Sequence, residues 1–198
     1  MSLALNLPLT KHITPSQQQV DIRDTEAGMV QGCLDEERWA QKKMYESHYG
    51  KMMGVCLRYS NNREDAKDII NEGFIKVFRY LHRYKVGTSL EGWIRRIMIN
   101  TAIDFYRKEV RHRTEDIENA YSASSKEADA VSIYSAKEIL SVIQKLPPSY
   151  RAVFNLYAIE GYSHREVGDQ LGISESTSRS NLVKARAKLK VLLHSLYK

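Results

Sequence analysis

The sequence contains few residues that break helices and almost no pattern of the kind that forms strands. Only 4 prolines and 10 glycines occur among its 198 residues. Runs in which valine or isoleucine alternates with polar residues are missing, whereas apolar residues recur at three- and four-residue spacing along most of the chain. We therefore expect an all-α fold, and the length is sufficient for one ordinary domain or two small ones.

The two cysteines, Cys33 and Cys56, lie far apart in the sequence and are not spaced as metal ligands are. Such a pair is best interpreted as two reduced thiols near a helical core, in a protein of the cytosol. No apolar run approaches the roughly 18 residues of a membrane span, and the N-terminus lacks the apolar segment of a signal peptide. We expect a cytoplasmic protein without membrane insertion.

Signatures of catalysis and of cofactor binding are also missing. The sequence has no metal-like spacing of histidine, cysteine and aspartate, no glycine-rich phosphate loop and no nucleophile elbow. We therefore predict no catalytic residue, no metal and no cofactor, which argues against an enzyme that acts on nucleic acid. The other alternative is a DNA-binding regulator with an N-terminal sensor domain, but the strands of a phosphoacceptor domain are missing.

Residues 162–181 form the most informative stretch, because they show the pattern of a helix, a turn and a second helix. Ser163 and Glu166 are spaced as a capping box at the start of the first helix. Gly172 tolerates the left-handed conformation of a sharp helix end, and Ser174 can cap the second helix. The spacing predicts a helix-turn-helix motif.

The second of these helices combines an apolar stripe with a basic face that is rich in hydroxyls. Leu182, Ala185 and Leu189 recur at helical spacing. Short hydroxyls and long cations lie off that stripe: Ser176, Thr177, Arg179, Ser180 and Lys184. Six cations, Arg186 among them, and no carboxylate occur from residue 179 to the end. With a net charge of +6 and a pI near 9.2, this pattern favours duplex DNA binding over a merely solvated face.

A helix that begins after Asn62 carries a separate polar face. Its apolar stripe consists of Ala66, Ile69, Ile70, Phe74, Val77 and Leu81. Its other face shows Asp65, Asp68, Asn71, Glu72 and Lys76. From the residues alone, this polar face is either simply solvated or a docking surface.

Residues 80–88 interrupt the helical pattern and are both basic and aromatic. Thr88 or Ser89 can cap the next helix, and Thr88 with Glu91 fits a capping box. This helix has Trp93 near its start and a basic segment, residues 107–113, at its end. Cations with interleaved aromatic residues suit single-stranded nucleic acid, because bases stack on aromatic faces while cations follow the backbone. The alternative is that Tyr84 and Trp93 are core residues.

Composition divides the chain into four parts. We expect a flexible extension at residues 1–24, a first domain at 25–113, an acidic linker at 114–134 and a second domain at 135–198. Five carboxylates in the linker oppose a single lysine, Lys126. In the second domain Pro147 and Pro148 end one helix, and Pro148 suits the first turn of the next.

In this order and at this spacing, several segments resemble the extracytoplasmic-function (group four) sigma factors of the sigma-70 family. These are minimal bacterial initiation factors with two helical domains. The resemblance covers the chain from about residue 26 to the C-terminus. It rests on residues 63–74 (REDAKDIINEGF), residues 93–100 (WIRRIMIN), Asp104 with Arg107, and the Leu146-Pro147-Pro148 segment before the helix-turn-helix.

The resemblance implies a role for three sets of residues and a function in promoter recognition and strand separation. One implied partner is core RNA polymerase, which the factor contacts at the clamp helices of the large subunit and at the flap region. A second is promoter DNA, both duplex and single-stranded. Whether an anti-sigma factor is a third partner is left open. The implied polymerase-docking residues are Asp65, Asp68, Asn71, Glu72 and Phe74. Those implied for the minus-ten element are Tyr84, Lys85, Thr88, Ser89, Trp93, Asn100, Asp104, Arg107 and Lys108. Those implied for the minus-thirty-five element are Ser176, Thr177, Arg179, Ser180, Val183, Lys184 and Arg186.

The chain departs from the family pattern at several positions. Asn71 stands where glutamine is usual, Gly73 where threonine or valine is, and Gly168 where alanine is common. Ser178 replaces a valine and Asn181 replaces a frequent arginine. We expect these changes to alter promoter preference and to loosen the last helix while the function is kept.

Overall fold

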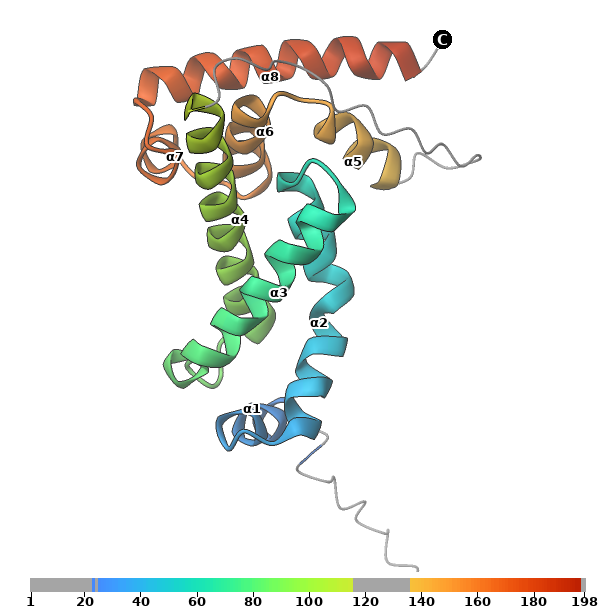
Figure 1. The fold of residues 1–198 in the computed structure, drawn as a ribbon, viewed down its shortest axis with the longest axis vertical. Coiled ribbons are helices and arrows are strands. Elements are labelled where there is room, and N and C mark those ends of the chain that lie inside the picture. The colour runs from blue at the N-terminus through green and yellow to red at the C-terminus, as the bar shows by residue number, and fades with distance from the viewer. Residues whose placement is uncertain (1–22, 24, 116–135, 197–198) are drawn as a thin grey trace, which may run out of the picture.

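The computed structural model describes residues 23, 25–115 and 136–196, and no strand occurs among them, which agrees with the predicted all-α fold (Figure 1). The N-terminal half contains α1 (Glu26–Leu34), α2 (Arg38–Tyr59), α3 (Arg63–Tyr80), the short 3-10 helix η2 (Leu81–Arg83) and α4 (Leu90–Glu115). The C-terminal half contains α5 (Ala136–Gln144), α6 (Pro148–Phe154), the π-helical turn η3 (Asn155–Ile159), α7 (His164–Leu171) and α8 (Glu175–Leu196). The predicted acidic linker and N-terminal extension fall almost entirely outside the described residues.

Most predicted helix ends are confirmed by the capping contacts. The Asn62 side chain accepts a hydrogen bond from the Asp65 amide at 2.8 Å. Pro148 occupies the first turn of α6, and Gly172 ends α7 in the left-handed conformation with a φ of 69°. Side-chain caps and left-handed glycines are local features, which is why the sequence predicts them well.

The predicted capping box at the start of α4 is wrong. Ser89, and not Thr88, caps this helix by accepting the Gly92 amide at 3.0 Å. The Thr88 hydroxyl instead donates to the Lys85 carbonyl at 2.8 Å, within the turn that precedes the helix. Of the two caps that the sequence offered, Ser89 is therefore the one that the helix uses, while the turn uses the Thr88 hydroxyl.

The N-terminal half is built around α2, α3 and α4, which pack on one another along their apolar stripes. Fully buried side chains from all three helices meet there: Met44, Met52, Val55, Ile69, Ile70, Val77, Ile94 and Met98. Cys33 and Cys56 are free and buried, as predicted. Burial raises the pKa of the Cys56 thiol to about 12, so that this group stays protonated and unreactive at neutral pH.

The C-terminal half lies across one end of this bundle, with α8 running over the top of the view in Figure 1. Helix α6 contacts α2 and α4, and α7 contacts α4. Val153, Leu156 and Val167 belong to the same buried cluster as the core of the N-terminal half. A second, smaller cluster joins α5 to α8 through Val142, Ile143, Leu146, Ala185 and Leu189. The two halves are therefore packed together, an arrangement that the sequence did not predict.

Gly73 explains one departure from the family pattern. A Cβ atom at this position would lie 2.3 Å from the sulfur of Met98, a side chain that is completely buried between α3 and α4. The missing side chain at Gly73 therefore provides the volume that the long Met98 side chain occupies.

We predict that Gly73→Ala lowers the free energy of unfolding by about 1 kcal/mol, because overpacking at Met98 outweighs the helix propensity gained. Gly50→Ala in α2 is the matched control, since a Cβ there meets nothing within 4 Å. The control should stabilise the protein by about 0.5–1 kcal/mol. Urea denaturation of both variants measures the difference, and stabilisation of both would contradict the steric account.

Candidate nucleic-acid and protein interfaces

The helix-turn-helix is held by contacts at both ends of α7. The Ser163 amide donates to the Glu166 carboxylate at 2.8 Å, and the Glu166 amide donates to the Ser163 hydroxyl at 3.3 Å, so the predicted capping box is present. Hydrogen bonds from the Ser163 hydroxyl and amide lower the pKa of the Glu166 carboxyl. At the turn, a Cβ on Gly168 would lie 2.7 Å from the Ile173 carbonyl oxygen. Glycine at this position therefore permits the close approach of α7 to the turn.

Ser178 is completely buried, yet its hydroxyl is satisfied. It lies 2.9 Å from Nδ1 of His164, whose ring stacks on Tyr157 at a centroid distance of 4.2 Å. A hydrogen bond between α7 and α8 thus stands in place of the apolar contact that a valine would make, and whether α8 is loosened stays a prediction. Burial, and then the charge of Arg179, lowers the pKa of His164.

The predicted minus-thirty-five residues all lie on the exposed face of α8: Ser176, Thr177, Arg179, Ser180, Val183, Lys184 and Arg186. Val183 is 67% exposed, an apolar side chain on an otherwise polar face. Arg179 forms an ion pair with Glu175, one turn earlier on the same helix. Ser174 caps the helix by accepting the Thr177 amide at 3.1 Å. The face thus offers hydroxyls, cations and the methyl groups of Thr177 and Val183, which are the groups that contact base edges and phosphates.

The predicted minus-ten residues divide into an exposed set and a buried residue. The exposed ones are Lys85, Thr88, Ser89, Asn100, Asp104, Arg107 and Lys108. Trp93 is half-buried and packs against the core. Tyr84 is only 8% exposed, and its hydroxyl donates to the Thr88 carbonyl at 2.6 Å while its ring packs 5.7 Å from that of Trp93. Burial raises its pKa. Tyr84 is therefore a core residue, which was the alternative interpretation of the sequence, and does not offer an exposed ring on which a base could stack.

The predicted docking face on α3 requires one correction as well. Asp68, Asn71 and Glu72 are exposed, and Asp65 is partly so. Phe74 is only 2% exposed and packs 4.6 Å from the ring of Tyr45. It belongs to the apolar stripe of α3, which packs into the core, and therefore does not form part of the exposed docking face.

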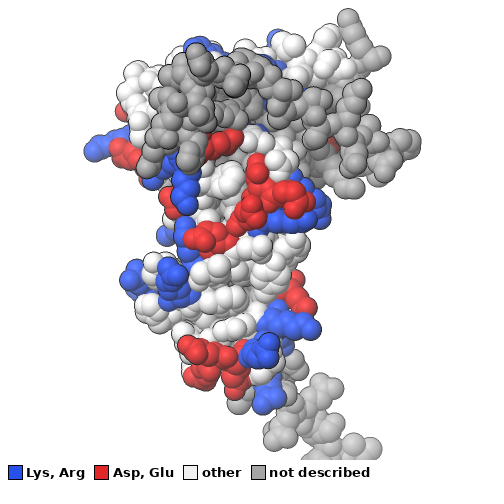
Figure 2. Space-filling view, viewed as in Figure 1, with Lys and Arg blue, Asp and Glu red and all other residues white. Residues whose placement is uncertain are grey.

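A cleft of about 520 Å³ between α3 and α4 brings the docking set and the minus-ten set together. Its lining includes Asp68 and Glu72 on one side and Asp104, Arg107 and Lys108 on the other. Lys76 bridges them, at 3.8 Å from the Glu72 carboxylate and 3.2 Å from that of Asp104. On the face seen in Figure 2, acidic and basic side chains form small neighbouring patches and no single continuous basic surface.

Within the described ranges, no group of three or more His, Cys, Asp or Glu side chains is arranged to hold a metal ion. None of the helices in those ranges is long and apolar enough to cross a membrane.

Two family models match the chain. The first, described as sigma-70 region 2, matches residues 44–112, and the second, sigma-70 region 4, matches residues 136–189. The chain belongs to the sigma-70 family. Region 2 thus corresponds to the half that contains α2, α3 and α4, and region 4 to the half that contains the helix-turn-helix.

Similar curated proteins include two with 32% identity. The ECF RNA polymerase sigma factor SigE of Mycolicibacterium smegmatis matches over 153 residues, which are 75% of this chain and 59% of that protein. The RNA polymerase sigma factor SigZ of Bacillus subtilis matches over 134 residues, 67% of this chain and 75% of the relative. The predicted membership of the ECF group is confirmed, since SigE is an ECF sigma factor, although the chain spans only about three fifths of the length of SigE.

The fold is shared with a solved sigma factor. The structure of RpoE in complex with the anti-sigma factor NepR, from Bartonella quintana, has a TM-score of 0.50 and 19% sequence identity. The alignment covers 77% of this chain and 96% of the RpoE chain. At this identity the likeness shows a common fold.

We predict that His164 and Ser178 are energetically coupled. Ser178→Ala and His164→Phe, which retains a ring against Tyr157, should each destabilise the protein, and the double variant should cost about 0.5–1.5 kcal/mol less than their sum. Urea denaturation of the four proteins at pH 7 measures this coupling. Simple additivity would show that the hydrogen bond contributes nothing.

The same pair should be pH-sensitive. Because the pKa of His164 is lower in the folded protein than its ordinary 6.5, the unfolded chain binds the proton more readily. The stability that the neutral ring contributes is present above pH 6.5 and is lost as the pH falls toward the lower folded value. The stability advantage of the wild type over His164→Phe should therefore shrink between pH 7 and pH 5, and an advantage that grows would contradict the account.

Proposed function

We propose that this chain is a transcription initiation factor that binds core RNA polymerase, directs it to specific promoters and assists strand separation. The observation that carries the proposal is the pair of exposed faces on α4 and α8, each made of the polar side chains that the family resemblance assigns to promoter DNA. It acts by binding alone, without catalysis, in the cytoplasm where polymerase works.

Recognition of duplex DNA is assigned to α8. Arg179, Ser180 and Lys184 are exposed on the side of α8 away from the Leu182 and Ala185 stripe. Phosphate contacts from the many cations of α8 supply salt-dependent affinity, and only contacts with base edges supply sequence preference. Arg179 is the best candidate for a base contact, because Glu175 restrains its guanidinium near the N-terminus of the helix.

Capture of a single strand is assigned to region 2. Extruding one base from the stack costs a few kcal/mol, which binding of the exposed base can offset without ATP. Because Tyr84 is buried, we assign binding of the base to exposed polar residues of the loop before α4: Lys85, Thr88 and Ser89. The partly exposed Trp93 ring is the remaining aromatic surface near that loop. Asn100, Arg107 and Lys108 extend this surface along α4.

Polymerase docking is assigned to Asp68, Asn71 and Glu72 on α3, with Asp65 at its edge. The partner surface is the clamp helices of the large subunit, and region 4 is assigned to the flap region. An anti-sigma factor is a further proposed partner, since RpoE, which has the same fold, occurs in complex with one. The direct test is to purify the tagged chain with core polymerase and assay the complex for promoter-directed transcription. Failure to bind core polymerase would refute the proposed function.

We predict that Arg179→Ala weakens binding of the holoenzyme to its preferred promoter by about 1–3 kcal/mol and relaxes preference at one base pair. Lys188 is an exposed cation farther along α8 that we expect to contact only phosphate. Lys188→Ala should therefore weaken binding to all promoter sequences by the same factor. Binding to a set of single-base promoter variants distinguishes the two effects. Equal and sequence-blind losses would show that Arg179 does not read a base.

We predict that Asp68→Arg combined with Glu72→Arg leaves folding intact but abolishes binding to core polymerase, because both carboxylates are exposed on one face. Glu46→Arg with Asp169→Arg changes the net charge equally at two exposed positions elsewhere and should still assemble. Circular dichroism melting and co-purification measure the two properties. A low melting temperature would assign these residues a structural role, and normal holoenzyme assembly would refute docking at α3.

A further inference from the structure

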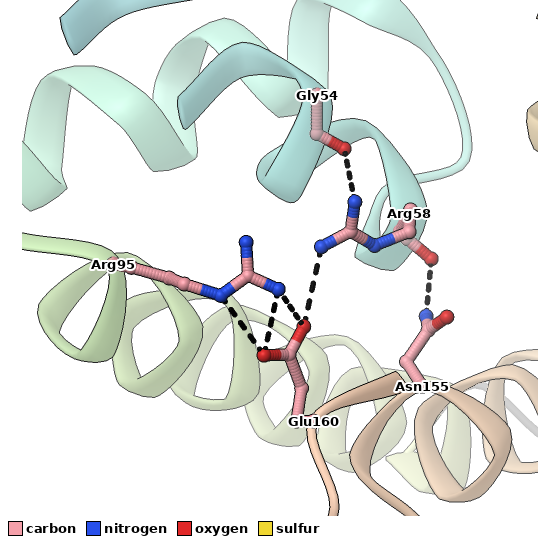
Figure 3. Close-up of polar contacts among 5 residues, drawn as sticks. All are labelled: Gly54, Arg58, Arg95, Asn155 and Glu160. Atoms are coloured by element: carbon pink, nitrogen blue, oxygen red, sulfur yellow. Dashed lines mark hydrogen bonds and ion pairs between the residues drawn. The ribbon is translucent and has the colours of Figure 1, made fainter. Parts of the chain in front are cut away.

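The contact between the two halves has an ion-paired centre. Glu160, which follows η3, reaches between α2 and α4, where its side chain is only 6% exposed (Figure 3). Arg95 on α4 donates to both carboxylate oxygens, with Nη2 at 2.8 Å from each and Nε at 3.1 Å from Oε2. Arg58 on α2 donates from Nη2 to Oε1 at 3.2 Å. Two guanidinium groups of region 2 thus hold one carboxylate of region 4.

The hydrogen bonds around this centre also join the two halves. The Asn155 side chain donates to the Arg58 carbonyl at 2.6 Å, and the Gln144 side chain donates to the Leu57 carbonyl at 2.9 Å. Farther along α4, Arg107 donates to the Gln170 carbonyl at 2.5 Å. Water can replace each of these bonds when the halves separate, so the polar part of the contact is suited to opening.

Separation of the halves would leave two cations facing outward. Arg58 and Arg95 remain with region 2, whereas Glu160 leaves with region 4. Glu91, one turn before Arg95, is already paired with Lys51 at 2.5 Å. The donors of the two guanidinium groups converge on the Glu160 carboxylate. Once this carboxylate has left, they are arranged to bind a different oxyanion in its place.

We propose that Arg58 and Arg95 form an anion-binding site with two alternative occupants. The Glu160 carboxylate fills it while the halves are packed together, and a phosphate of promoter DNA fills it after they separate. This inference rests on the proposed function. Nucleic acid is favoured over a protein carboxylate because the same contact between the halves includes Arg107 of the minus-ten set, which donates to the Gln170 carbonyl, so separation exposes the site beside a residue assigned to DNA. Glu160 is then a competitor of the DNA that region 2 binds.

The competition has a thermodynamic consequence. A ligand that binds only the open form has an apparent affinity reduced by the fraction of chains that are open. The connection between α4 and α5 allows opening, since the 20 residues 116–135 reach up to about 70 Å when extended. Substitutions that remove the carboxylate should therefore strengthen DNA binding, and substitutions that remove an arginine of the site should weaken it.

The test uses the full chain, small-angle scattering for the radius of gyration and a fluorescent oligothymidylate as the DNA probe. Glu160→Gln should increase the radius of gyration and tighten DNA binding, by about tenfold if the closed form predominates nine to one. Arg95→Gln added to Glu160→Gln should leave the chain open but weaken binding about tenfold relative to Glu160→Gln alone. The slope of log affinity against log salt should also fall by about 0.7, the value for one lost phosphate contact on a single strand.

Arg38→Gln in the Glu160→Gln background is the matched control, since Arg38 is an exposed cation at the start of α2. It should change affinity and slope less than Arg95→Gln does. If Arg95→Gln fails to fold by near-UV circular dichroism, Arg58→Gln in the same background takes its place.

Two results would overturn the inference. One is an unchanged radius of gyration and DNA affinity in Glu160→Gln; the other is an arginine variant no weaker than the Arg38→Gln control. A chain that opens without any arginine effect on DNA affinity would refute the phosphate site. Neither readout involves polymerase or a promoter, so failure here is distinguishable from failure of the proposed function.

Discussion

The arrangement of this protein depends on one buried carboxylate. Taking an ion out of water costs several kcal/mol, roughly, even after the surroundings relax, and the cost is recovered only with good geometry and charge compensation. Glu160 has both, because Arg95 binds it with two nitrogens and Arg58 with a third. Since the acid and its two bases belong to different halves, the compensation exists only while regions 2 and 4 are packed together. The apolar contacts of Val153 and Leu156 with region 2 add affinity, but the ion pairs also fix the orientation.

Departures from the family pattern are compensated by neighbours in space. Gly73 lacks a side chain where Met98 fills the volume, and Ser178 adds a buried hydroxyl where His164 provides the hydrogen-bond partner. A buried polar group without a partner costs about 1–3 kcal/mol, so Ser178 is tolerated because of its neighbour and not because serine suits the position. The sequence suggested a loosened last helix because Ser178 was considered there without His164, its partner in space.

The accuracy of the sequence predictions followed the range of the interactions. Caps at Asn62 and Ser163 and the left-handed Gly172 depend on three or four neighbouring residues, and these were predicted correctly. Helical periodicity also identified the α3 stripe, but the family resemblance then placed Phe74 on the docking face although it belongs to that stripe. Tyr84 was misplaced because its burial depends on Trp93 and on the fold of its own loop. The contact between the halves pairs residues from 63 to 102 positions apart in the chain, beyond the reach of periodicity or spacing.

Lys76 links two surfaces that the sequence treated as separate. It contacts Glu72 of the docking face and Asp104 of the minus-ten face, and all three lie in the cleft between α3 and α4. Lys76 is three-quarters shielded from solvent, with 25% of its side chain exposed, so water screens these contacts less than it would on an open surface. When a basic partner surface engages Glu72, Lys76 loses part of its compensation and its interaction with Asp104 strengthens. Because the two carboxylates share one cation, effects at the docking face and at the DNA face are not additive. Under the proposed function, polymerase docking and strand capture would therefore be coupled through this cleft.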